Sequence, residues 1–257
     1  MSVKDKIAAI KDCLAKNELK IQEYVIQDGK AHPFAVICPG GGYSMVCSSR
    51  EGRPYAKYLN SKGFSAFVIT YRCKKKGRYP APMDDLALAI KTIMDRSEEL
   101  GLDKSNYSVW GSSAGGHLAA SFGTDRMGYA KYGLPKPRTV VLIYPVITMG
   151  DMAHKGSRVN LLGKNPDEKM IELTSVERQI THNYPPCFIW CGNDDKIVSP
   201  ENSKMLDAAL KAYGIRHEFE IYSGVGHGVG LGKGLACEGW IEKAITFWMA
   251  QTSIVYI

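Results

Sequence analysis

The chain has 257 residues, of which 45% are hydrophobic and 23% are charged. This length and composition exclude wholesale disorder and suit one α/β domain whose core needs neither disulfides nor metals. The 33 Lys and Arg residues exceed the 26 Asp and Glu residues and give a net charge of +7. Spread over a whole chain, that excess is weak support for nucleic acid as the main partner.

The N-terminal residues 1–20 are amphipathic and charged, and they contain no apolar core of signal-peptide length. No apolar run approaches the length of a membrane span. These features predict a cytoplasmic protein in which the seven cysteines are reduced and mostly structural. Cys187 and Cys191 are four residues apart, a spacing that suits neither a zinc site nor a redox pair, so no metal is expected there.

Apolar, β-branched runs alternate with helical patterns along the chain. Strands are predicted at 19–27, 34–38, 65–71, 107–110, 139–144, 187–191 and 218–222. Helices are predicted at 51–61, 82–100, 114–123, 203–213 and 237–250. Continuous apolar strands separated by helices predict an α/β fold with a mostly parallel central sheet and helices on both faces. No internal repeat or long linker is visible, so we expect a single domain over residues 1–257.

A G-x-S-x-G motif, Gly111-Ser112-Ser113-Ala114-Gly115, follows a predicted strand and opens a predicted helix. In that context the serine sits on a sharp turn that lifts its hydroxyl above the sheet edge, where ligands bind in parallel sheets. Side chains in place of the two glycines would collide across the turn. The motif predicts Ser113 as a nucleophile, and the alternative is a tight turn with an inert serine.

A serine hydroxyl needs a base to take its proton and an acid to orient that base. In this architecture the chain order is serine, then acid, then histidine. Asp194 and Asp195 follow the strand at 187–191, and His227 follows the last predicted strand. We therefore predict Asp195, in preference to Asp194, as the acid and His227 as the base. His117 lies one turn after the nucleophile, where a structural role is favoured over a catalytic one.

Three glycines, Gly40-Gly41-Gly42, follow an early strand and are similar to the oxyanion loop of lipases and esterases. The pattern predicts that the N–H groups of Gly41 and Gly42 join that of Ala114 in an oxyanion hole. A phosphate cradle is the alternative, but no Lys-Ser/Thr pair follows, and a nucleotide site is not predicted. The basic segment Lys74–Arg78 could attract an anionic substrate, although a solvated loop is the favoured interpretation.

Taken together, these motifs resemble the α/β-hydrolase superfamily. They are most similar to the small bacterial esterases of the acetyl-esterase and xylan-esterase-like group. The resemblance spans about residues 34–231 and rests on segments 39–43, 71–72, 80–86, 111–118, 185–186, 192–203 and 226–228.

The resemblance implies an α/β-hydrolase fold with a minimal cap. It also implies an esterase that acts without cofactor or metal on short acyl groups, often the acetyl esters of sugars. The family acid is usually the fourth residue of a G-x-x-D stretch, which corresponds to Asp195. Related lipases usually carry His where this chain has Pro39. The stretch before Gly40 is too short for a full N-terminal cap, so residues 146–184 are the candidate lid.

The function expected from the sequence is a serine carboxylic-ester hydrolase. Ser113, His227 and Asp195 would act through an acyl-enzyme on short acetyl-type esters, acetylated sugars among them. The alternatives are a serine peptidase of the same fold and a non-catalytic ligand-binding protein. The expected partner is a small-molecule ester, with no nucleic acid, membrane or cofactor. The oligomeric state is left open.

Overall fold

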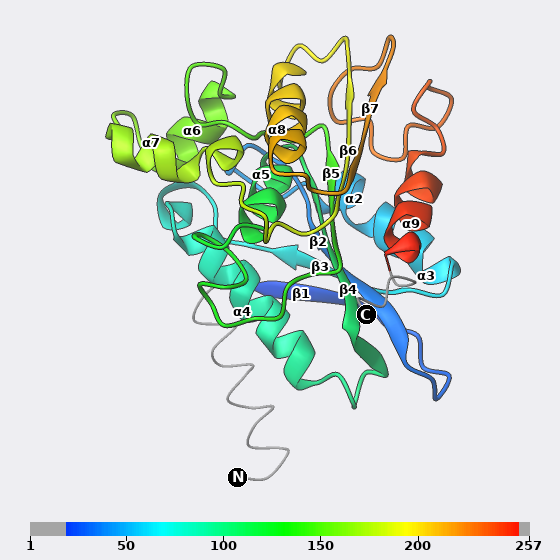
Figure 1. Ribbon diagram of the computed structural model, residues 1–257. Coiled ribbons are helices and arrows are strands. Elements are labelled where there is room, and N and C mark those ends of the chain that lie inside the picture. Colours follow the sequence, from blue (N-terminus) through cyan, green and yellow to red (C-terminus); the bar gives the residue numbers. More distant parts are fainter. Residues whose placement is uncertain (1–18, 252–257) are drawn as a thin grey trace.

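A seven-stranded sheet runs through the centre of the computed structural model, which describes residues 19–251 (Figure 1). The strands are β1 (Lys20–Tyr24), β2 (His32–Cys38), β3 (Ser65–Thr70), β4 (Leu102–Ser112), β5 (Thr139–Ile143), β6 (Cys187–Gly192) and β7 (His217–Tyr222). Their order in the sheet is β1-β3-β2-β4-β5-β6-β7. Only the β1–β3 pair of this sheet is antiparallel, which confirms the predicted mostly parallel α/β fold.

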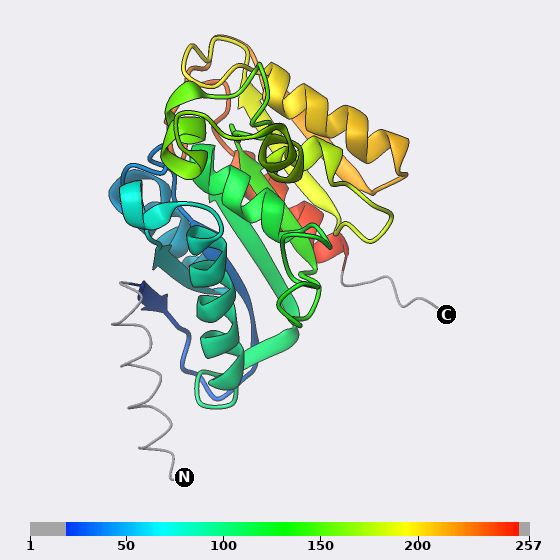
Figure 2. The same cartoon turned by 90° about the vertical axis from the view of Figure 1, so that its left-hand side faces the viewer.

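Helices cover both faces of the sheet. The helical elements are α2 (Ser48–Glu51), α3 (Arg53–Ser61), η1 (Lys74–Gly77), α4 (Ala81–Asp95), α5 (Ser113–Phe122), α6 (Lys155–Leu162), α7 (Glu168–Thr174), η2 (Val176–Arg178), α8 (Glu201–Ala212) and α9 (Trp240–Ala250). Buried side chains of α4, α5 and α8 pack on one face, and those of α3 and α9 pack on the other. In Figure 2, α4 and α5 lie in front of the sheet and α9 lies behind it.

Alternation of side chains along each strand separates the core into two layers. On β2, Phe34 and Val36 pack with α4 and α5, whereas Ala35 and Ile37 pack with α3 and α9. All four side chains are fully buried. Because both faces are covered, the strands read as continuous apolar runs rather than as alternating ones.

Three predicted helix boundaries are wrong. The helix expected at 51–61 is divided at Gly52, where an added β-carbon would lie 2.6 Å from the Val68 side chain. The helix expected at 82–100 ends at Asp95, before a turn that leads into β4. The last helix begins only at Trp240. The preceding residue, Gly239, has a φ of 88°, which occurs in turns and is incompatible with a right-handed helix.

Residues 146–184 contain two short helices, α6 and α7, that the periodicity did not predict. They are only eight and seven residues long, and each is capped by a side chain of the preceding residue, His154 and Asp167. Figure 1 shows both helices close together at the upper left, to one side of the sheet. The segment is joined to the turn at Ser113 by a hydrogen bond from the Val146 N–H to the Ser113 carbonyl.

The six cysteines within residues 19–251 are free, and four of them are buried, as the sequence predicts. Cys13 lies outside the described residues. Within the same range, no helix is both long and apolar enough to cross a membrane.

A buried ion pair fixes the chain after β3. Asp85 on α4 is fully buried and accepts hydrogen bonds from the backbone N–H of Arg72 at 2.7 Å and from its guanidinium at 2.8–3.0 Å. Two residues further on, the Lys74 N–H donates to the Tyr43 carbonyl, just after the three glycines. The pair therefore holds the segment on which the glycine loop rests.

We expect Asp85→Ala to lower the free energy of unfolding by about 3–5 kcal/mol, because the Arg72 groups lose their buried partner. Urea denaturation at pH 7 measures the change. Asp95→Ala is the matched control, since its ion pair with Lys91 on the same helix is exposed and is worth less than about 1 kcal/mol. Equal losses in the two variants would contradict the role of the buried pair.

Candidate active site

Ser113 occupies a sharp turn between β4 and α5. Its φ of 54° lies in the left-handed region that non-glycine residues rarely adopt. The flanking glycines make the turn possible, because an added β-carbon at Gly111 would lie 2.1 Å from the Gly115 carbonyl oxygen. One at Gly115 would lie 2.1 Å from the carbonyl oxygen of Cys38 on β2. These close approaches explain the spacing of the G-x-S-x-G motif.

The structure brings Ser113, His227 and Asp195 together in one hydrogen-bonded chain. The Ser113 Oγ lies 2.8 Å from His227 Nε2, and His227 Nδ1 lies 2.6 Å from Asp195 Oδ2. The other Asp195 oxygen accepts the N–H groups of Ile197 and Val198, each at 2.9 Å. The carboxylate is thus held in place while its second oxygen faces the imidazole.

Asp194 does not join this chain, because its exposed side chain lies beside Lys196. The loops that carry Asp195 and His227 follow the parallel neighbours β6 and β7. They are fastened together by hydrogen bonds from the Asp194 N–H to the Val225 carbonyl and from the Gly224 N–H to Asn193 Oδ1. Adjacent strands therefore bring Asp195 and His227 to one place.

The three-glycine loop passes directly over the turn at Ser113. An added β-carbon at Gly40 would lie 2.9 Å from the Ser113 Cβ. Gly41 has a φ of 132°, and a β-carbon there would lie 2.2 Å from the Met45 carbonyl oxygen. Among the described residues, no acceptor pairs with the N–H of Gly41 or Gly42. The Ala114 N–H is in the first turn of α5, where N–H groups have no partner in the helix.

A buried carboxylate that the sequence analysis missed supports this loop. Glu51 Oε2 accepts the Gly40 N–H at 2.8 Å, and Oε1 accepts the Tyr144 hydroxyl at 2.9 Å. The Tyr71 hydroxyl also donates to the Pro39 carbonyl at 2.7 Å. These contacts hold the loop on both sides of Pro39 and Gly40. The sequence points to this role only by placing a glutamate nine residues after the glycines, and an acidic residue is equally expected at the solvent-exposed start of a helix.

Tyr144 links the glycine loop to the histidine loop. Its hydroxyl accepts the Gly230 N–H at 3.3 Å, and its ring centroid lies 4.8 Å from that of His227. Burial raises the pKa of Tyr144 well above its ordinary value, so the phenol stays protonated and donates to Glu51. One buried network therefore contacts both the three-glycine loop and the loop that carries His227.

His117 is hydrogen-bonded to Thr174 and Tyr43 rather than to Ser113. Its Nε2 lies 2.8 Å from the Thr174 carbonyl, and its Nδ1 lies 2.9 Å from the Tyr43 hydroxyl. Because the carbonyl can only accept, the ring carries its proton on Nε2 and Nδ1 accepts. Burial lowers the pKa of His117 to about 4, so the ring is neutral at pH 7.

The basic segment Lys74–Arg78 divides into two parts. Lys74, Lys75 and Lys76 are exposed, as expected of a solvated loop. Arg78 is not part of that loop surface, because its guanidinium donates to the carbonyls of Val159 and Asn160 at the end of α6. Cations at a helix C-terminus stabilise its unpaired carbonyls, which gives Arg78 a structural role.

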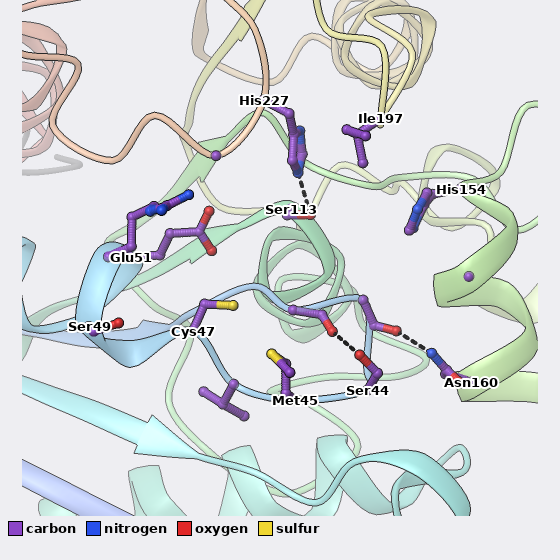
Figure 3. A pocket seen from close by; sticks show the side chains of 16 residues that line it. Ser44, Met45, Cys47, Ser49, Glu51, Ser113, His154, Asn160, Ile197 and His227 are labelled. Carbon is purple, nitrogen blue, oxygen red and sulfur yellow. Dashed lines mark hydrogen bonds between the residues drawn. The ribbon is translucent and has the colours of Figure 1, made fainter.

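A cleft of about 690 Å³ opens above Ser113 (Figure 3). One part of its wall comes from the loop and helix after β2, with Met45, Cys47 and Glu51. Another part comes from residues 154–160, with His154 and Asn160 on the opposite side of Ser113 in Figure 3. Within residues 19–251, no group of three His, Cys, Asp or Glu side chains is arranged to hold a metal ion.

Residues 24–210 match the protein family described as BD-FAE. The chain is 31% identical over 226 residues to endo-1,4-beta-xylanase B of Butyrivibrio fibrisolvens. The matched region covers 84% of this chain and 35% of that protein. It is 32% identical over 199 residues to an acetylxylan esterase of Xylanibacter ruminicola, which covers 76% and 40% of the two chains. The chain thus matches well under half of the length of these curated relatives.

Solved structures of ester hydrolases are similar to this chain over nearly its whole length. An acetyl ester-xyloside bifunctional hydrolase from Caldicellulosiruptor lactoaceticus superposes with a TM-score of 0.83 at 34% identity. The match covers 91% of this chain and 89% of that one. A carboxylesterase from Lactobacillus plantarum superposes with a TM-score of 0.78 at 21% identity, covering 92% and 94%, and shares the α/β-hydrolase fold.

The first prediction from this geometry concerns Glu51. We expect Glu51→Ala to leave the buried Gly40 N–H and Tyr144 hydroxyl without an acceptor, and to lower the free energy of unfolding by about 2–4 kcal/mol. The looser glycine loop should also lower kcat/KM for p-nitrophenyl acetate at least tenfold. Glu51→Gln can still accept from Gly40 and should retain most of both quantities. Glu98→Ala, an exposed control, should change neither. Wild-type kinetics in Glu51→Ala would contradict the proposed support.

The second prediction concerns pH and His117. An unfolded histidine titrates near pH 6.5, and the folded ring near 4. Its stabilising effect is therefore complete above pH 6.5 and is lost as the pH falls towards 4, by about 3 kcal/mol in all. We expect His117→Gln to lose correspondingly less free energy of unfolding between pH 7 and pH 4 than the wild type. A His117→Gln curve parallel to that of the wild type would refute the assignment.

Proposed function

The chain belongs to the BD-FAE family and has the α/β-hydrolase fold, and on this basis we propose that it is a serine carboxylic-ester hydrolase. The observation that carries the proposal is the hydrogen-bonded chain from the Ser113 Oγ through His227 to Asp195, at the floor of the cleft. In this chain a base contacts the hydroxyl and an acid orients the base.

In the proposed reaction the Ser113 Oγ attacks the ester carbonyl while His227 Nε2 takes the hydroxyl proton. Asp195 holds the ring in the tautomer with a proton on Nδ1 and stabilises the imidazolium that forms. The N–H groups of Gly41, Gly42 and Ala114 donate to the oxyanion of the tetrahedral intermediate. His227 then gives its proton to the departing alcohol, which leaves an ester between Ser113 and the acyl group.

Water completes the proposed cycle. His227 takes a proton from a water molecule that attacks the acyl-enzyme, and a second tetrahedral intermediate forms in the same oxyanion hole. Its collapse returns the proton to the Ser113 Oγ and releases the carboxylic acid. The same residues thus serve both halves of the reaction, and none of the steps requires a cofactor.

Short acyl groups, acetyl above all, are the proposed substrates. The relatives named above include an acetylxylan esterase and an acetyl ester-xyloside hydrolase, which supports acetyl esters of sugars for this chain as well. We also propose that residues 1–257 form one catalytic domain. In it, residues 146–184 act as a wall of the cleft rather than as a separate cap.

The direct test is Ser113→Ala with p-nitrophenyl acetate, butyrate and octanoate. We expect the wild type to prefer the acetate and the variant to lose about 10⁴-fold or more in kcat. Ser121→Ala is the matched control, because that buried serine lies on the same helix and its hydroxyl has no hydrogen-bond partner among the described residues. A fluorophosphonate should label Ser113 in the wild type.

Three results would count against this function. Undiminished turnover by Ser113→Ala would remove the nucleophile. Cleavage of aminoacyl amides by a wild type that ignores esters would favour a peptidase. Failure of a fluorophosphonate to label Ser113 would favour a non-catalytic binding protein.

A further inference from the structure

The two sides of the cleft beside Ser113 differ in chemistry. Met45, Val46 and Cys47 give one side thioether, methyl and thiol groups. His154, Gly156 and Asn160 form another side, with an imidazole and a carboxamide. Figure 3 places Cys47 and His154 on opposite sides of the nucleophile. The proposed acetyl substrate has the same asymmetry, since its acyl part is a methyl group and its alcohol part carries hydroxyls.

Local structure fixes the orientation and tautomer of His154. The residue caps α6, and its Nδ1 accepts the Ser157 N–H at 3.3 Å and lies 2.9 Å from the Ser157 hydroxyl. A neutral ring with an accepting Nδ1 carries its proton on Nε2. Burial, and to a lesser extent the neighbouring His227, lower the pKa of His154, although Asp195 acts in the opposite direction. The ring is therefore neutral at pH 7 and has a donor at Nε2.

The Nε2 edge of His154 is left open. No described residue forms a hydrogen bond with this atom. A β-carbon at Gly156 would lie 3.1 Å from Cε1 and 3.6 Å from Nε2, so a side chain at that position would cover the edge. On the other side, the ring borders the oxyanion loop, because a β-carbon at Gly42 would lie 3.8 Å from Cε1.

Asn160 adds an acceptor to the same wall. Its Nδ2 donates to the Gly42 carbonyl at 2.8 Å, which assigns the amide orientation. Its backbone carbonyl accepts from Arg78 at 2.9 Å, so the residue is held from two directions. Among residues 19–251 no donor is paired with Oδ1. The wall therefore has one fixed donor and one fixed acceptor, both uncharged.

We propose that His154 Nε2–H and Asn160 Oδ1 form a subsite for the hydroxyl groups of a sugar on the alcohol side of the ester. The inference rests on the proposed esterase function and deepens it. A hydroxyl both donates and accepts, so neighbouring ring hydroxyls can satisfy the two groups together. Because His154 and Asn160 are both neutral, they bind neutral hydroxyl groups better than they would bind a ligand that carries a carboxylate or a phosphate. In this role both residues determine specificity and take no part in the proton transfers.

The test compares kcat/KM for three acetate esters: monoacetylated methyl xyloside, cyclohexyl acetate and p-nitrophenyl acetate. The main variant is His154→Asn, because asparagine is a favoured N-cap and preserves the start of α6 while removing the imidazole donor. His182→Asn is the matched control, since His182 belongs to the same segment but bonds the Tyr213 carbonyl away from the cleft. Thermal unfolding of each variant checks that the fold is kept.

We expect His154→Asn to lower kcat/KM for the xyloside ester about tenfold and to leave both hydroxyl-free esters within twofold of the wild type. His182→Asn should leave all three unchanged. Equal losses on all three esters, no loss on the xyloside ester, or a wild type that does not hydrolyse it would each overturn the subsite. These outcomes differ from failure of the proposed function, in which Ser113→Ala would hydrolyse p-nitrophenyl acetate at the wild-type rate.

Discussion

The site depends on the left-handed backbone of Ser113. A non-glycine residue in this conformation costs about 1–3 kcal/mol and persists only where its surroundings enforce it. Here the turn is packed tightly against β2, because the Cys38 carbonyl leaves no room for a side chain at Gly115. The β2–β4 pairing brings Cys38 beside Gly111, so the sheet register places the glycine loop above the serine. Fold and site thus share one constraint.

A second constraint is the buried network around Glu51. Its two oxygens serve the Gly40 N–H and the Tyr144 hydroxyl, and Tyr144 in turn contacts Gly230 and the His227 ring. Buried polar groups stabilise a structure only when all of them are satisfied, so such a network favours a single arrangement of its loops. The three strand-end loops that it joins come from distant parts of the chain.

Much of this architecture could be predicted from the sequence, because the apolar strands, the serine elbow and the order of Asp195 and His227 are local patterns tied to strand ends. Glu51 could not be found in this way. Its burial depends on Tyr144, which is 93 residues away in the chain. The short helices α6 and α7 were missed because their periods are too brief to detect, and their stability comes from caps and packing. The boundary errors at Gly52 and Gly239 have a similar origin in close packing and turn geometry.

The hydrogen bond between Asn160 and Gly42 joins two properties that protein engineers usually try to vary separately. In the proposed reaction residues 154–160 face the leaving alcohol, and the same segment also braces the loop proposed to donate to the oxyanion. A chimaera that receives this segment from a relative therefore exchanges substrate preference and turnover rate together. Evolution faces the same linkage, so a change of specificity in this scaffold would disturb the glycine loop less at His154, whose ring borders Gly42 and is hydrogen-bonded to Ser157, than at Asn160, which donates to the Gly42 carbonyl.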